Sequence, residues 1–223
     1  MPQENNAYAE FGSHCHSVLE RWAKGELLSF ETAEAYENGY ADAVKHYFPP
    51  FPKGLAGKYF DEGKAYFDSF DGFGDAEILS VEEKFEIDIG GNPFVGIADL
   101  VLREKDGSIT IIDHKSKSMQ TMKKELPLYK RQLYIYAAYA KQRFGEYPKL
   151  LRFNMFRYND FVNEPFNMTA YEETLRWVEE TIRRIKSEHD WLVSESGYFC
   201  RWICSVNNHC PVGETIMNSG RKK

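Results

Sequence analysis

The chain has 223 residues, 43% hydrophobic and 15% aromatic, so it is expected to fold around a core rather than remain disordered. Its net charge of -6 argues against a general nucleic-acid coat protein, whose affinity would come from a basic surface. No apolar run approaches the ~20 residues of a membrane helix, and the N-terminus shows no signal-peptide pattern. We therefore expect a cytoplasmic protein without a membrane partner, whose four cysteines form no structural disulfides.

Three helices are expected before the first strand. Ser13 can cap a helix that ends at Gly25, and His16 then lies in the first turn of that helix. A second helix is expected over residues 30–47, where two consecutive prolines stop it, and a third over residues 55–70.

The next segments have the patterns of β-strands. Residues 77–89 alternate between apolar and charged side chains, which predicts a strand with one buried and one solvated face, and Glu82 falls on the solvated face. Residues 94–102 and 109–112 are apolar and rich in β-branched side chains. Because the turn-forming residues 105–108 join them, these two strands are expected to pair as a β-hairpin.

The second half of the chain is expected to alternate between helix and strand. A helix is predicted over residues 126–144 and a strand over residues 149–158. A capping box from Thr169 to Glu172 opens a long helix that is expected to reach Leu192. This succession predicts an α/β (α+β) fold with a mixed central β-sheet flanked by helices.

The predicted hairpin carries the charged residues that most need an explanation. Asp99 lies in its first strand, and Asp113 ends the second strand two residues before Lys115. An acid within a core strand is costly unless it is paired, hydrogen-bonded or bound to a metal. Side chains alternate along a strand, so Asp113 and Lys115 fall on the same face. Two carboxylates and an ammonium group at one point suit a divalent cation and a phosphate, and we expect an open, solvated site.

Four features follow one another along the chain: a histidine in an early helix, a Gly-x-x-Asp strand, an Asp-x-Lys strand and a Gln-x-x-x-Tyr helix. They are His16 preceded by Gly12, Gly96 to Asp99, Asp113 to Lys115, and Gln132 with Tyr136. In this order the chain resembles the PD-(D/E)XK nuclease superfamily. Its likeness is greatest to the RecB-like exonuclease branch, which includes phage exonucleases and CRISPR adaptation nucleases. The resemblance implies a restriction-endonuclease-like core.

The same resemblance implies a site that holds Mg²⁺ or Mn²⁺. It makes Asp99, Asp113, Lys115 and Glu82 catalytic residues, His16, Asp99, Asp113 and the His114 carbonyl metal ligands, and Gln132, Tyr136, Ser116 and Lys117 substrate-binding residues. Lys115 would hold and help deprotonate the attacking water. His14 does not match the pattern, and its replacement is expected to be nearly neutral.

The function expected from this resemblance is that of a metal-dependent DNA nuclease, an exonuclease without sequence specificity. Its expected partner is DNA, as single-stranded or double-stranded ends, with a protein of recombination, repair or phage replication as a further candidate. One alternative is an endonuclease on the same core, of structure-specific or restriction type, or a nuclease acting on RNA. Another is a catalytically silent domain that binds DNA or a partner, although the intact set of Asp99, Asp113 and Lys115 argues against it.

The chain is expected to form a single nuclease domain with four parts. These are an N-terminal helical part (1–75), the catalytic sheet with the Gln-x-x-x-Tyr helix (76–160), a long helix (161–195) and a cysteine-containing tail (196–223).

The cysteines allow a second metal-binding hypothesis. Several RecB-like nucleases hold a four-iron cluster with one early and three tail cysteines, and Cys15, Cys200, Cys204 and Cys210 are the candidates here. The spacing departs from that pattern, because three residues separate the first two tail cysteines and Cys15 adjoins His16. An iron–sulfur cluster or zinc therefore remains an alternative that we do not favour. We expect the tail cysteines to be reduced and buried near Trp202.

Overall fold

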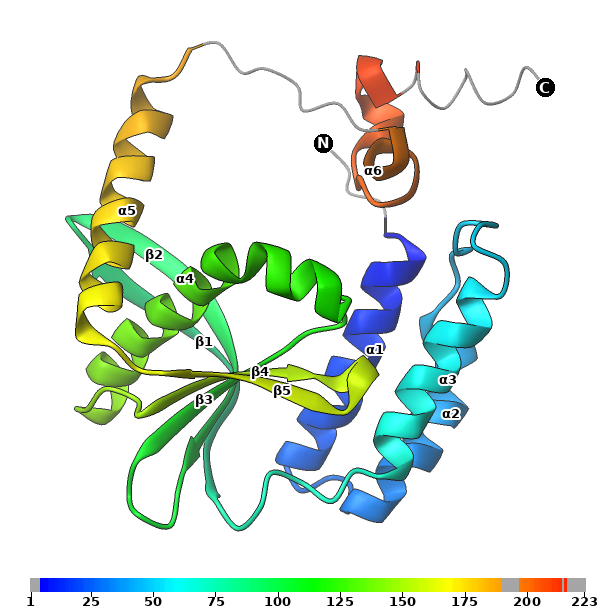
Figure 1. Cartoon of the computed structure of the whole chain (residues 1–223), viewed down its shortest axis with the longest axis horizontal. Helices are drawn as coiled ribbons and strands as arrows, with labels where there is room; N and C mark the ends of the chain where they lie inside the picture. Colours follow the sequence, from blue (N-terminus) through cyan, green and yellow to red (C-terminus); the bar gives the residue numbers. More distant parts are fainter. Residues whose placement is uncertain (1–4, 190–196, 214, 216–223) are drawn as a thin grey trace.

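A five-stranded mixed β-sheet forms the centre of the molecule, as the computed structural model of residues 5–189, 197–213 and 215 describes it (Figure 1). The strands are β1 (Glu77–Ile89), β2 (Asn92–Arg103), β3 (Ile109–His114), β4 (Leu150–Met155) and β5 (Asp160–Pro165), in the spatial order β1-β2-β3-β4-β5. β3 and β4 are parallel, and the other neighbours are antiparallel. The expected mixed sheet is confirmed.

Helices lie on both faces of this sheet. They are α1 (Ala7–Ala23), α2 (Thr32–Ala43), α3 (Leu55–Asp68), α4 (Met119–Phe144), α5 (Met168–Ser187) and α6 (Gly197–Trp202), with short 3₁₀ turns η1 (Ser29–Glu31), η2 (Phe156–Tyr158) and η3 (Asn207–His209). Within the described ranges, no helix combines the length and the apolar character that crossing a membrane would require.

Two hydrophobic clusters fix how the helices sit on the sheet. One face of the sheet, with Val101 and Ile111, packs against α4 and α5. The opposite face, with Leu100 and Ile112, packs against Trp22 of α1. Figure 1 shows α1, α2 and α3 grouped on one side, away from α4 and α5. The open end of the β2–β3 hairpin, where Asp99 and Lys115 lie, is therefore between α1 and α4.

The first helix begins earlier than the sequence predicted. Its N-cap is Asn6, whose side chain accepts a hydrogen bond from the backbone N–H of Ala9 at 3.0 Å. Asn and Ser are equally good caps, and the earlier start lets Phe11 be completely buried. His16 is consequently in the middle of α1 instead of in the first turn.

Helix α4 also begins earlier, because Ser118 caps it by accepting the N–H of Thr121 at 3.1 Å. Pro127, which suggests a helix start by its missing N–H, lies inside this helix instead.

The last long helix is capped by Asn167, which accepts the N–H of Ala170 at 3.0 Å, rather than by the predicted box at Thr169. Strand β5 was not predicted at all. The long helix ends at Ser187, and the predicted end at Leu192 lies outside the described residues.

Candidate active site

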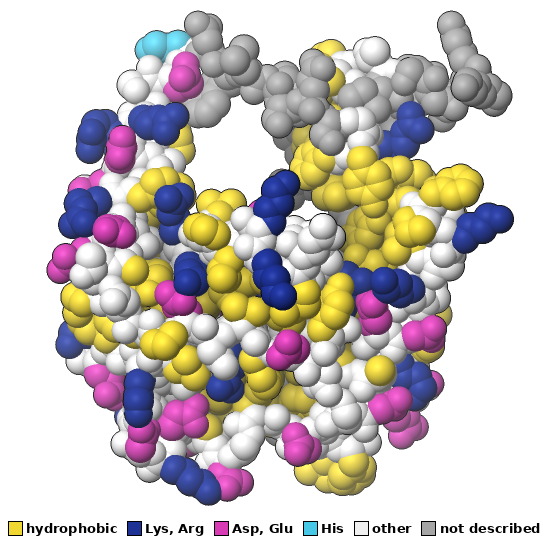
Figure 2. Space-filling model, in the orientation of Figure 1, with side chains coloured by type: hydrophobic (Ala, Val, Ile, Leu, Met, Phe, Trp, Pro, Cys, Tyr) yellow, Lys and Arg dark blue, Asp and Glu magenta, His cyan; other side chains and the backbone are white. Residues whose placement is uncertain are grey.

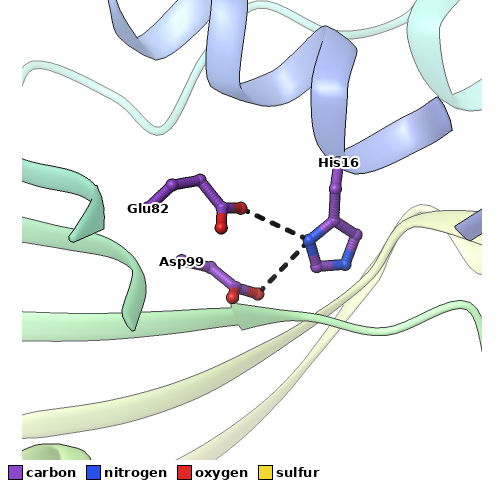
Figure 3. Close-up of side chains that lie close together, drawn as sticks. All are labelled: His16, Glu82 and Asp99. Atoms are coloured by element: carbon purple, nitrogen blue, oxygen red, sulfur yellow. Dashed lines mark ion pairs between the residues drawn. The ribbon is translucent and has the colours of Figure 1, made fainter. Parts of the chain in front are cut away.

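The side chains of His16, Glu82 and Asp99 converge from α1, β1 and β2 (Figure 3). The Nδ1 atom of His16 lies 3.5 Å from Oε1 of Glu82 and 3.7 Å from Oδ2 of Asp99. One ligand atom from each of the three lies within 4.8 Å of the others. In the described part of the chain, this is the one group of three or more His, Cys, Asp or Glu residues with that spacing.

The other ring nitrogen of His16 determines how the imidazole is used. Its Nε2 atom lies 3.1 Å from the backbone carbonyl oxygen of His114. A carbonyl oxygen can only accept, so Nε2 carries the proton and donates it to this bond. In the neutral ring, Nδ1 is then the atom with the free lone pair, and it faces the two carboxylates. This is the tautomer that a metal ligand needs.

The register of the β1–β2 hairpin places Glu82 opposite Asp99. Paired residues Val81 with Leu100 and Glu83 with Ala98 bracket the two acids. Glu82 has a φ of +46°, a left-handed conformation that is costly for a residue other than glycine. Such strain is concentrated at functional sites. The expectation that Glu82 belongs to the solvated strand face is wrong, because its half-buried side chain faces His16.

The turn between β1 and β2 is a further sequence signal that identifies Glu82 as the residue opposite Asp99. Gly90 and Gly91 both have positive φ, as a tight two-residue turn between Ile89 and Asn92 requires. Counting back seven residues from Ile89 and forward seven from Asn92 reaches Glu82 and Asp99.

A hydrogen bond fixes the Asp99 carboxylate, but its surroundings disfavour the ionised form. Its Oδ2 accepts the backbone N–H of His114 at 2.7 Å. Burial, followed by the charge of Asp113, raises the pKa of Asp99 to about 7, although His16 and the His114 N–H oppose this. Burial lowers the pKa of His16, but the Glu82 and Asp99 carboxylates outweigh that effect and raise it. A bound cation would relieve the repulsion between these acids, so the donor set fits a divalent metal.

Asp113 and Lys115 form a close ion pair beside this group. Lys115 Nζ lies 2.6 Å from Oδ2 of Asp113, which has no further partner within the residues described. Asp113 is only 1% exposed, so the expectation of an open, solvated position is wrong for this residue. Burial raises the pKa of Asp113, and the Lys115 charge works against that rise.

Helix α4 extends the polar network away from the acids. Lys115 Nζ donates to Oε1 of Gln132 at 2.9 Å, and Gln132 Nε2 donates to the Tyr136 hydroxyl at 2.5 Å. The predicted pair on α4 and the predicted lysine are thus brought together in one chain of hydrogen bonds.

His114 contributes its backbone to the site and its side chain to the core. The backbone N–H binds Asp99 and the carbonyl binds His16, while the imidazole stacks on Phe73 with ring centroids 5.9 Å apart. Its Nδ1 lies 3.0 Å from Nδ2 of Asn154, and burial keeps the pKa of this imidazole well below its usual value.

Ser116 and Lys117 are near the site but outside the converging group. Ser116 packs against Gly12 of α1, where an added Cβ would come within 3.3 Å of its hydroxyl oxygen. Lys117 Nζ lies 4.9 Å from the ring centroid of Tyr129. Both residues line a groove of about 430 Å³ beside the N-terminal end of α4.

Arg157 is a buried residue near the site that the sequence reasoning missed. It donates to the Ser116 carbonyl at 3.0 Å and pairs with Glu62 at 2.6 Å, while its guanidinium covers the Tyr59 ring. The sequence signal for Arg157 was its position near the end of the strand predicted over residues 149–158.

His14 proves to be a core residue. It is 8% exposed, its Nε2 lies 2.7 Å from the Tyr36 carbonyl oxygen, and it packs on the Tyr36 ring. Burial lowers the pKa of His14. The expectation that its replacement leaves catalysis nearly unchanged stays a prediction, but the packing adds a cost in stability.

The cysteines do not converge in the described part of the chain. Cys15 is fully buried in α1, in the cluster around Phe11, and burial raises the pKa of its thiol well above the usual value. Cys200 is buried, but Cys204 and Cys210 are half-buried, so the expected burial holds for one of the three tail cysteines. No group of cysteines with metal-ligand spacing occurs among the residues described.

Comparisons with known proteins place the chain in a family. No curated protein matches it. A solved structure, described as the crystal structure of SSO0001, shares 21% identity over 88% of this chain and 81% of its own, with a TM-score of 0.36. A family model of the PD-(D/E)XK nuclease superfamily matches residues 1–211. Nucleases of this superfamily typically use divalent metals, in agreement with the acidic group at His16. The chain therefore belongs to the PD-(D/E)XK nuclease superfamily.

Proposed function

We propose that this protein is a Mg²⁺- or Mn²⁺-dependent deoxyribonuclease of the RecB-like branch that degrades DNA from its ends without reading sequence. The observation that carries the proposal is the convergence of His16, Glu82 and Asp99 beside the Asp113–Lys115 pair. These residues come from α1 and from the sheet. Stable folding alone does not require three partly or fully buried acids at one point.

One imidazole nitrogen and two carboxylates, with Asp113 adjacent, form the donor set for the metal. Carboxylate oxygens suit Mg²⁺, and the additional imidazole makes Mn²⁺ a competent occupant. The cation would supply charge that polarises the scissile phosphate and makes a water molecule more acidic. The His114 carbonyl, expected from the resemblance to be a further ligand, accepts the Nε2–H of His16 on the ring edge away from Nδ1, so in this geometry it fixes the imidazole and is not part of the donor set.

Lys115 is the group in position to hold the attacking water and to face the negative charge that develops on the phosphate. Asp113 and Gln132 hold its ammonium from two sides, at 2.6 and 2.9 Å, so it is fixed rather than mobile. A fixed ammonium can orient the water and stabilise negative charge that develops on the phosphate.

Gln132 and Tyr136 would position the DNA strand through a phosphate, and Ser116 and Lys117 would hold it further along the groove beside α4. Contacts to phosphate fix the register of a strand but carry no base information. The proposed cleavage is therefore independent of sequence.

The exonuclease assignment is tested with end-labelled linear DNA and covalently closed circular DNA of equal length, each with Mg²⁺ or Mn²⁺. We expect degradation of the linear DNA and intact circles. Linearised or nicked circles would show an endonuclease and overturn this part of the proposal.

A further inference from the structure

An open apolar groove of about 460 Å³ lies between β2, α4 and α5. Val95, Leu128 and Ile185 project into it from the three elements, and each is more than half exposed. Single exposed apolar side chains are ordinary, but such a group on facing elements marks a surface that is covered in use. Figure 2 shows hydrophobic side chains between α4 and α5, with Lys and Arg side chains beside them.

The groove borders the proposed active site. Gln132 and Tyr136 form part of its lining, and Gln132 also accepts the hydrogen bond from Lys115. One side chain thus separates the groove from the lysine placed at the scissile phosphate. A nucleic-acid strand lying across the active site can therefore reach this groove by passing Gln132.

The polar residues of the groove favour an anionic occupant with flat apolar surfaces. The guanidinium of Arg131 lies 4.0 Å from the ring centroid of Trp177, and both residues line the groove. The lining residues of the described chain include no Asp or Glu. By helical spacing, Lys124 and Glu125 both lie about one turn from Leu128 on α4, so Arg131 is the one charged side chain that the described lining supplies. Basic grooves with apolar and aromatic walls are how proteins hold unpaired bases and their phosphates.

We propose that this groove binds unpaired nucleobases adjacent to the phosphate that is cut, so that the substrate strand is single-stranded at the site. The inference rests on the proposed nuclease function. In a duplex the faces of the bases are stacked on one another, so the apolar walls can meet those faces only after unpairing. A second copy of this chain is the competing occupant.

The test measures binding in the presence of a chelator, where cleavage does not interfere. Fluorescence anisotropy gives the Kd of the full chain for labelled oligothymidine and for an oligomer of equal length that carries abasic residues. The variants are Leu128→Ser and Ile185→Ser. The matched control is Leu28→Ser, because Leu28 is 58% exposed and Leu128 is 53% exposed, and Leu28 lies outside the groove.

We expect the wild-type protein to bind oligothymidine ~10-fold more tightly than the abasic oligomer, because stacking adds to phosphate attraction. Leu128→Ser and Ile185→Ser should each weaken oligothymidine binding ~5-fold and leave abasic binding unchanged, since they remove apolar contact but no charge. Leu28→Ser should change neither value.

Equal affinity of the wild-type protein for the two oligomers would overturn the groove assignment, whether or not the protein cleaves DNA. A wild-type dimer that Leu128→Ser dissociates in sedimentation velocity, with base-dependent binding unchanged, would also overturn it and assign the groove to a second copy. Base-dependent binding that Leu128→Ser abolishes, in a protein that cleaves no DNA with either metal, would support the groove while the proposed nuclease function fails.

Discussion

Glu82 and Asp99 stand opposite each other on β1 and β2, and both carboxylates face the same nitrogen of His16 (Figure 3). The neighbouring strand pairs fix their separation, so the two acids cannot move apart without disrupting the hairpin. The protein therefore keeps Asp99 buried and close to other carboxylates, with only His16 and the His114 N–H opposing the rise of its pKa. This cost is the physical basis of the predictions that follow.

Replacing Asp99 by asparagine should stabilise the metal-free protein. The pKa of Asp99 is raised from 3.8 to about 7, so between these values the folded protein binds a proton that the unfolded chain has lost. The contribution of Asp99 to stability therefore falls as pH rises from about 4 to about 7. The asparagine side chain does not ionise, so Asp99→Asn should raise the free energy of unfolding at pH 8 by at most ~4 kcal/mol.

Urea denaturation of both proteins at pH 5 and pH 8, in chelator, measures this effect. Excess Mg²⁺ or Mn²⁺ should raise the melting temperature of the wild-type protein and leave that of Asp99→Asn nearly unchanged. A variant less stable than the wild type at pH 8 in chelator would show that the acids are not in conflict.

Two adjacent glutamates provide a matched pair of variants. Glu82→Ala should lower kcat at least ~10-fold and weaken the response to metal, because it removes a carboxylate from the donor set. Glu83→Ala should leave activity within about twofold, since Glu83 pairs with Arg143 on the surface at 3.2 Å. Steady-state kinetics over a Mn²⁺ titration compare the two. Equal effects would remove the special role assigned to Glu82.

Lys115 should matter for both activity and stability. Lys115→Ala should lower kcat ~10²- to 10⁴-fold, and it leaves the buried Asp113 without its partner. Breaking a buried ion pair in this way costs ~3–5 kcal/mol, so this variant should also melt at a lower temperature.

The double variant Asp113→Asn/Lys115→Met separates these two effects. It removes both charges together, so it should regain most of the lost stability and remain inactive. Thermal melting and a cleavage assay on the three proteins provide the comparison. Near-normal turnover in either Lys115 variant would contradict the role of this lysine.

Replacing His16 should impair catalysis, whereas replacing His14, the other histidine of α1, should lower stability. His16→Ala should reduce cleavage at least ~10²-fold and shift the metal dependence, with little effect on melting in chelator. His14→Ala should instead lower the stability by ~2–3 kcal/mol, because it removes a buried ring and its hydrogen bond to Tyr36. The folded His14 variant should keep its turnover and metal response. Loss of cleavage in folded His14→Ala, with unchanged Mn²⁺ dependence in His16→Ala, would reverse the assignment.

The sequence predicted β1 to β4 because their signals are local, and it missed β5. Alternation along residues 77–89 and the turn at 105–108 specify the strands, and both strands of the catalytic hairpin lie where expected. Helix starts were predicted less well. Asn6 and Ser13 are equivalent as caps, and only the burial of Phe11 against the neighbouring helices selects the earlier one.

The motif residues of the candidate site could be named from the sequence, but their arrangement in space could not. The motif residues identify Asp99, Asp113 and Lys115, but their spacing does not reveal that Asp113 is buried. The family pattern selects Glu82 over Glu83, but the positive φ of Glu82 and its position across from Asp99 are visible only in the structure. Both properties depend on pairing between strands, which the composition of one strand does not record.

The measurement that tests the central claim most directly is cleavage of labelled linear DNA. One wild-type preparation is assayed after chelator treatment and again after return of excess Mg²⁺ or Mn²⁺. The Asp99→Asn variant is assayed in the same way. We predict no cleavage in chelator, recovery with either metal, and none by the variant at any metal concentration. Undiminished cleavage in excess chelator, or wild-type rates from Asp99→Asn, would contradict a metal-dependent nuclease site at His16, Glu82 and Asp99.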